Sequence, residues 1–141
     1  MSDTGHTVKS YAEEMQSLND DLIKMGSLTE SQLADAMEAV IKLDKESVDK
    51  IVQNDSKINA LRAAIDNQIT TVLVKRAPMA VDLRITISTM KISHDLERIG
   101  DLAKSVAKKV TPLPIDLPDE LVNSLRTVSY THLTLPTTVI V

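Results

Sequence analysis

Residues 77–101 read APMAVDLRITISTMKISHDLERIGD and decide the fold class. Pro78 fits the first turn of a helix, because its missing N–H has no intrahelical partner there. Apolar and small side chains then recur at steps of three and four, the spacing of a helix–helix packing seam. The predicted seam consists of Ile85, Thr89, Ile92, Leu96, Ile99, Ala103, Val106 and Val110. A helix from about residue 78 to residue 110 follows, with one face packed on its neighbours.

Two upstream stretches carry the same spacing. The first covers about residues 8–43, as one long helix or as two with a bend near Gly26. The second covers about residues 44–76, with Asp44 as its N-cap and two basic residues at its end. Each helix would have about 30 residues and a length of about 45 Å at 1.5 Å per residue. With short connections, the three predict an all-α, antiparallel up-down-up bundle.

Composition agrees with this fold class and narrows the function. The 141 residues suffice for one modest domain or a fragment of a larger one, and 43% of them are hydrophobic. Phe and Trp are absent, so Leu, Ile, Val, Met and Ala must form the core, which suits helices better than a β-sandwich. A net charge of −4 without a basic run argues against nucleic acid as a partner. The lack of Cys excludes disulfides, and no apolar run would form a signal peptide or span a membrane, so membrane contact is expected only through partners.

The remaining segments have distinct characters. We expect residues 1–7 to be disordered, residues 8–110 to form the three-helix bundle, and residues 111–119, TPLPIDLPD, to form a proline-rich linker. Residues 120–128 begin a fourth helix. Residues 129–141 are threonine-rich, β-prone and interrupted by a proline, so we expect an irregular tail or a short strand. This tail also looks like the non-native end produced when a reading frame continues into foreign sequence, which would make the chain truncated.

A second row of side chains on the 78–110 helix lies away from the seam and includes His94, Glu97 and Asp101. Glu97 and Asp101 are four residues apart, so their Cβ atoms are about 6 Å apart and their carboxylates repel unless a cation lies between them. Hard oxygen donors suit Mg, Ca, Mn or Fe, and His94 adds a nitrogen donor. The ordinary interpretation is a solvated acidic pair whose charge is offset by Arg98 and Lys104.

The 44–76 helix has a similar flank. Asp55, Asn59, Arg62 and Asp66 follow one another at three- and four-residue steps, and Asp55 and Asn59 supply two more oxygens. A solvated helix edge is again the ordinary alternative. No glycine-rich phosphate loop, GxSxG, HExxH or Cys nucleophile is present. The sequence therefore predicts a binding or regulatory module and not an enzyme.

Two blocks of the chain resemble the PhoU family of bacterial phosphate-uptake regulators: APMAVDLR (77–84) and KISHDLERIGDLAKSVAKK (91–109). Residues 25–65 resemble the first two helices of that family, and residues 112–122 resemble the join to a second three-helix repeat. The resemblance covers about residues 8–128. It implies a complete first repeat and only the opening of a second, which leaves one bundle face uncovered and favours dimerisation or aggregation.

The resemblance also implies a function and a site. A PhoU-like protein is cytoplasmic, often a homodimer, and a negative regulator that restrains the phosphate-specific ABC transporter and quiets the phosphate-sensing histidine kinase. Some members bind multinuclear metal clusters on the bundle surface at E/D-x-x-x-D motifs. Carried over, these are Glu97-x-x-x-Asp101 and Asp55-x-x-x-Asn59, with Asn59 replacing an acid and Arg62 standing where Glu is common. No cofactor is required, and an Fe, Mn, Mg or Zn cluster on the bundle surface is an optional occupant.

Three alternatives stay open from the sequence. The chain is a metal- and phosphate-binding module whose ligand state is the signal, an accessory protein of a low-affinity phosphate permease, or a helical scaffold without ligands. All three share the predicted bundle, so they differ in what the acidic rows and the exposed surfaces bind.

Overall fold

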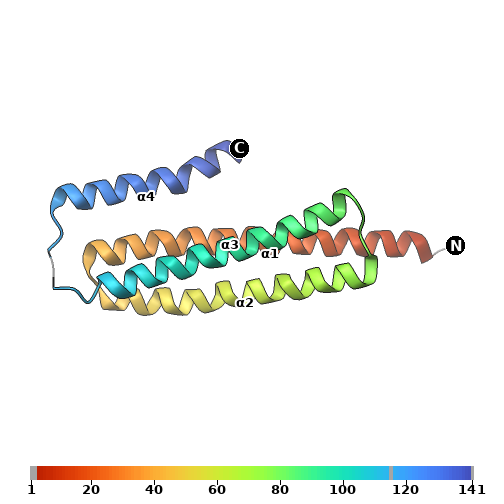
Figure 1. Cartoon of the computed structure of the whole chain (residues 1–141), viewed down its shortest axis with the longest axis horizontal. Coiled ribbons are helices and arrows are strands. Elements are labelled where there is room, and N and C mark those ends of the chain that lie inside the picture. Colours follow the sequence, from red (N-terminus) through yellow and green to blue (C-terminus); the bar gives the residue numbers. More distant parts are fainter. Residues whose placement is uncertain (1–2, 115, 141) are drawn as a thin grey trace.

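The computed structural model describes residues 3–114 and 116–140, with side chains described at residue 5 and at residues 8–114 and 116–131. All regular structure in these ranges is helical, and the predicted all-α class is confirmed. The first three helices run up, down and up as a bundle, and the fourth turns back beside the first (Figure 1). The helices are α1 (Asp3–Lys42), α2 (Lys45–Arg76), α3 (Val81–Val110) and α4 (Asp119–Ile140).

The turn between α1 and α2 takes two residues. Leu43 has a φ of 51° and reverses the chain. Asp44 is the N-cap of α2, as predicted, and its carboxylate accepts the Glu46 N–H at 3.0 Å and the Ser47 hydroxyl at 2.8 Å. These hydrogen bonds, that from Ser47 first, lower the pKa of Asp44. A tight, capped turn makes α1 and α2 antiparallel neighbours.

The connection between α2 and α3 corrects the prediction for Pro78. α3 begins at Val81, so Pro78 lies before the helix and not in its first turn. A proline disfavours the α conformation of the residue before it, so its main effect here is to end α2. Ala77 accordingly takes a left-handed conformation with a φ of 41°, and Ala80 has a φ of 53° at the start of α3.

The core follows the predicted seams of α1 and α2. One buried cluster joins Leu18 and Met25 of α1 to three isoleucines of α2, and a second joins alanines of α1 and α3 to Ile51. Every isoleucine of α2 in these clusters is at most 2% exposed. α1 and α2 therefore both supply bulky side chains to the core, and α3 contributes small ones to the second cluster.

The predicted seam of α3 is half right: Thr89 and Ala103 are buried and Leu96 and Val110 are partly buried, but the other four members are exposed. The buried face of α3 consists of small residues: Thr86, Thr89, Ser93, Gly100, Ala103 and Ala107. The threonine and serine hydroxyls on this face donate hydrogen bonds to carbonyl oxygens of the same helix, as Thr86 does to Asp82 at 2.8 Å. These hydroxyls are therefore satisfied although they are buried. This small face suits the bulky isoleucines of α2. Four predicted seam residues, the α3 stripe, are instead 41% to 46% exposed: Ile85, Ile92, Ile99 and Val106.

Both ends of the described chain are more helical than predicted. α1 begins at Asp3, inside the segment 1–7 for which we expected disorder, and that expectation stays a prediction. α4 continues to Ile140, so the tail is not irregular up to that residue. Its threonines fit a helix because their hydroxyls bond to carbonyls one turn back, as Thr131 does to Thr127 at 2.7 Å. Residues 1, 2 and 141 lie outside the described ranges, and the origin of the tail stays a prediction.

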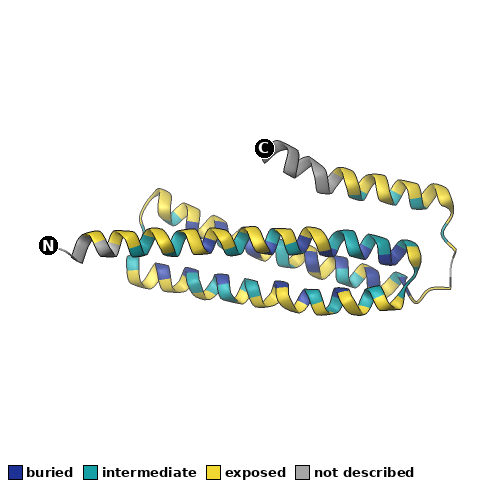
Figure 2. Cartoon of the chain, turned by 180° about the vertical axis from the view of Figure 1, so that it is seen from behind, coloured by how far each residue is buried: buried dark blue, intermediate teal, exposed yellow. Residues whose placement is uncertain are grey.

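α4 contacts only α1 among the described helices, and most of its described side chains are exposed (Figure 2). An ion pair of 3.7 Å joins Arg126 of α4 to Glu38 of α1. Within the described residues, none of the four helices combines the length and apolarity that crossing a membrane takes.

Candidate functional site

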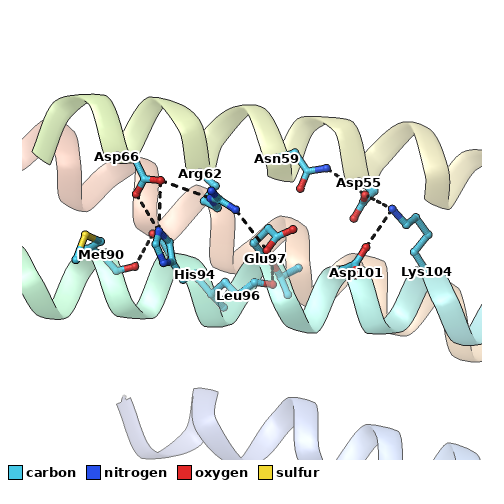
Figure 3. A network of polar contacts seen from close by, with 12 residues as sticks. Asp55, Asn59, Arg62, Asp66, Met90, His94, Leu96, Glu97, Asp101 and Lys104 are labelled. Carbon is cyan, nitrogen blue, oxygen red and sulfur yellow. Dashed lines mark hydrogen bonds and ion pairs between the residues drawn. The ribbon is translucent and has the colours of Figure 1, made fainter. Parts of the chain in front are cut away.

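The two predicted polar rows face each other along the boundary between α2 and α3 (Figure 3). All four residues predicted as metal ligands lie along this boundary. The row lies beside the core at one end and is open to solvent at the other. From α2 it includes Asp55, Asn59, Arg62 and Asp66, and from α3 His94, Glu97, Asp101 and Lys104.

Asp55 is the buried end of the row, with a side chain only 5% exposed. Its Oδ1 accepts a hydrogen bond from Nε2 of Gln32 at 3.0 Å. Its Oδ2 accepts the ammonium of Lys104 at 2.7 Å and the amide N–H of Asn59 at 3.3 Å. Donors from α1, α2 and α3 thus converge on one carboxylate, which satisfies a charge that would otherwise be costly to bury.

Gln32 is a site residue that the sequence reasoning missed. It is fully buried, and its amide donates to the carbonyl oxygen of Gly100 at 2.8 Å as well as to Asp55. Its Oε1 accepts the amide of Asn54 at 3.1 Å. The sequence did indicate that Gln32 is buried, because Met25, Thr29, Gln32 and Ala36 continue the three- and four-residue steps of the α1 seam. A polar residue within an apolar seam indicates a buried polar contact.

Lys104 links the two helices at this end of the row. Its ammonium lies 2.7 Å from Oδ2 of Asp55 on α2 and 3.2 Å from Oδ1 of Asp101 on its own helix. The hydrogen bond to Asp55 raises the pKa of Lys104, and the partial burial of the ammonium opposes that rise with a smaller effect. The side chain is therefore a fixed positive charge between two carboxylates, a more specific role than the predicted charge offset.

The open end of the row repeats the alternation of charge. Arg62 lies 3.7 Å from the carboxylate of Glu97 and 3.5 Å from that of Asp66. Asp66 in turn contacts Nε2 of His94 at 3.1 Å. The side chains of Arg62 and His94 are 41% and 47% exposed, so each of these pairs stabilises the fold by less than about 1 kcal/mol.

As arranged, this donor set does not fit a metal cluster. Hard divalent cations take six or more oxygen ligands at about 2.0–2.6 Å. Here Asp55 is occupied by three protein donors, Asn59 presents its N–H and not its oxygen, and Glu97 faces a guanidinium. Across the described part of the chain, no three His, Asp or Glu side chains are grouped closely enough to hold a metal. Metal binding by the four predicted residues stays a prediction.

The chain is similar to known proteins over most of its length. Residues 22–110 match the family model of the PhoU domain. The "Phosphate-specific transport system accessory protein PhoU homolog" of Caulobacter vibrioides is 40% identical over 106 residues, which are 75% of this chain and 46% of that protein. The protein of the same name from Zymomonas mobilis is 42% identical over 109 residues, 77% of this chain and 46% of that protein.

The fold is similar to a solved structure. PhoU from Pseudomonas aeruginosa superposes with a TM-score of 0.78 at 31% identity, covering 88% of this chain and 60% of that one. The chain spans less than half the length of the two curated relatives named here. Because the PhoU domain model matches more than half of the residues, the chain belongs to the PhoU family.

Proposed function

We propose that this chain is a cytoplasmic negative regulator of phosphate uptake and of phosphate-responsive two-component signalling. It acts through contacts with the ATPase of a phosphate ABC transporter and with a phosphate-sensing histidine kinase, and it catalyses no reaction. The names of its relatives, accessory proteins of the phosphate-specific transport system, support the transport part of this proposal.

The observation that supports action by protein contact is the α3 stripe. Its four members are spaced seven residues apart, so they lie along one line of the helix and match the repeat of a helix-packing seam. Each is nearly half exposed, so covering it would stabilise a complex by about 1 kcal/mol per side chain. Half-exposed aliphatic side chains at this regular spacing support an interaction surface.

A second copy of the chain is the other occupant that this stripe suits. The stripe is a straight aliphatic line, so two antiparallel copies would bury the same residues against each other. We therefore include a homodimer in the proposal. Sedimentation velocity over a concentration series separates self-association from contact with another protein.

Capture experiments test the proposal. The immobilised chain should retain the transporter ATPase or the sensor kinase from the same bacterium when phosphate is abundant. Replacing Ile92 and Ile99 of the stripe with Glu should lower capture at least about tenfold, because two charges would be buried at the contact. The matched control is Ile23→Glu on α1, where the side chain is 63% exposed and lies outside the stripe. Failure to capture either partner, or equal loss in the control, would contradict the proposal.

A further inference from the structure

We propose that the ammonium of Lys104 neutralises the carboxylates of the row between α2 and α3, so that this row needs no metal ion. Removing the ammonium would open a divalent-cation site on Asp55 and Asp101. This inference is independent of the proposed contacts with transporter and kinase, because it concerns how the bundle holds its own charges.

The position of the ammonium carries the inference. Its nitrogen lies 2.7 Å from a carboxylate oxygen of α2 and 3.2 Å from one of α3, so it bridges the two acidic rows (Figure 3). A lysine ammonium is a compact point charge with three donors and takes the place of a small cation between two carboxylates. Asp55 and Asp101 are the residues whose negative charges it offsets.

Burial explains why this place needs a cation. The carboxylate of Asp55 is 5% exposed, and a charge so far from water requires an opposite charge close by. Gln32 and Asn59 donate hydrogen bonds to it but carry no charge. Lys104 is itself only 22% exposed and supplies that charge from a neighbouring helix.

The surrounding residues disfavour a metal ion while the ammonium is in place. A divalent cation within a few ångströms of Nζ would be repelled, and its approach to Asp55 would have to displace Gln32 or Asn59 as well. At the other motif, Arg62 places a second positive charge 3.7 Å from Glu97. Each E/D-x-x-x-D/N motif thus already has a protein cation.

Without the ammonium, the same atoms become oxygen ligands. Asp55 and Asp101 would face each other without an opposite charge between them, and Asn59 would be able to turn its amide oxygen toward the gap. Two carboxylates and an amide oxygen form a hard donor set that suits Mn²⁺ or Mg²⁺. A bound cation would therefore restore the stability that removing the ammonium costs.

The test measures thermal unfolding and calorimetric binding of Mn²⁺ on the whole chain. We expect the unmodified chain to keep its Tm in millimolar Mn²⁺ or in a chelator. We expect Lys104→Ser to lower the Tm by about 10 °C. Mn²⁺ should bind to this variant with a stoichiometry of about one ion per chain and should raise its Tm again. Lys104→Arg should keep the charge, lose less stability and gain no Mn²⁺ binding. The control Lys108→Ser, one turn further along α3 at an exposed position, should change neither quantity.

Two results would overturn the proposal. One is stoichiometric Mn²⁺ binding to the unmodified chain that is abolished by Asp101→Asn, which would show that a metal already occupies the row. The binding of Mn²⁺ to the unmodified chain can be measured even if Lys104→Ser does not fold. The other is a folded Lys104→Ser that gains no Mn²⁺ binding, which would reduce the Lys104 contact to an ordinary salt bridge.

Discussion

The ammonium of Lys104 contacts the buried carboxylate of Asp55 at 2.7 Å and so joins α3 to α2 beside the core. The contact lies next to Gln32 of α1, which hydrogen-bonds to the same carboxylate. One buried carboxylate thereby sets the register of three helices, because a shift of any of them by one turn would leave a charge or an amide unpaired.

Gln32→Leu should destabilise the bundle although it replaces a polar residue in the core by an apolar one. The change leaves Oδ1 of Asp55 without its amide donor, and an unsatisfied buried acceptor costs about 1–3 kcal/mol. Urea unfolding of Gln32→Leu should therefore show a lower midpoint. Gln53→Leu on exposed α2 surface is the control and should change the midpoint little. A gain in stability for Gln32→Leu would show that the network is dispensable.

Gly26 and Gly100, which both lie inside helices, should respond in opposite directions to larger residues. At Gly26 an added Cβ meets only Leu96 at 3.9 Å, which is ordinary contact, so Gly26→Ala should stabilise the fold by about 0.5–1 kcal/mol. At Gly100 an added Cβ meets Ile58 at 3.3 Å and Gln32 at 3.4 Å, so a large residue does not fit. Gly100→Leu should destabilise by about 1–3 kcal/mol or more, as overpacked cores do. Chemical denaturation of both variants checks the pair, and similar effects of equal sign would contradict this packing.

Stability should fall at alkaline pH in a way that depends on Lys104. The folded-state pKa of Lys104 is raised, so above the unfolded-state pKa of about 10.4 the folded chain keeps a proton that the unfolded chain loses. The stabilising contribution is thus complete below that pH and is lost as the pH rises through the folded-state pKa. The pKa of Tyr11 is also raised and acts in the same direction.

A comparison with Lys104→Met isolates the contribution of the lysine, because Tyr11 titrates in both proteins. Urea unfolding from pH 8 to pH 11.5 should show a difference in the free energy of unfolding between the unmodified chain and Lys104→Met. This gap should be constant at first and should narrow above about pH 10.4. A gap that is unchanged across this range would mean that Lys104 titrates alike in the folded and unfolded chains.

The sequence predicted the helices well and one packing face poorly. In α1 and α2 the spacing of large apolar residues indicated the core, as Leu18 and Ile58 show. In α3 two faces could pack, one aliphatic and one small. The shapes of α1 and α2 decide between them, since an added Cβ at Gly100 would already meet Ile58 of α2 at 3.3 Å and Gln32 of α1 at 3.4 Å. Periodicity finds an apolar face but does not say what covers it.

The candidate site was predictable in its acidic residues and not in their partners. Helical spacing alone places Glu97 and Asp101 in one row, and Asp55 and Asn59 in another. The contacts of Gln32 and Lys104 depend on how far apart the helices pack and where long side chains turn. Those are tertiary properties, so a solvated acidic row, a metal site and an acidic row neutralised by a lysine look alike in the sequence.

The pairing of Asp55 with Lys104 is tested most directly by a double-mutant cycle. Asp55→Asn, Lys104→Met and the double variant would be unfolded in urea at pH 7, and the coupling energy would be taken from the four chains. A buried ion pair at 2.7 Å should give a coupling of at least about 1.5 kcal/mol. A coupling near zero would contradict the inference that Lys104 is the cation that neutralises the carboxylates of this row.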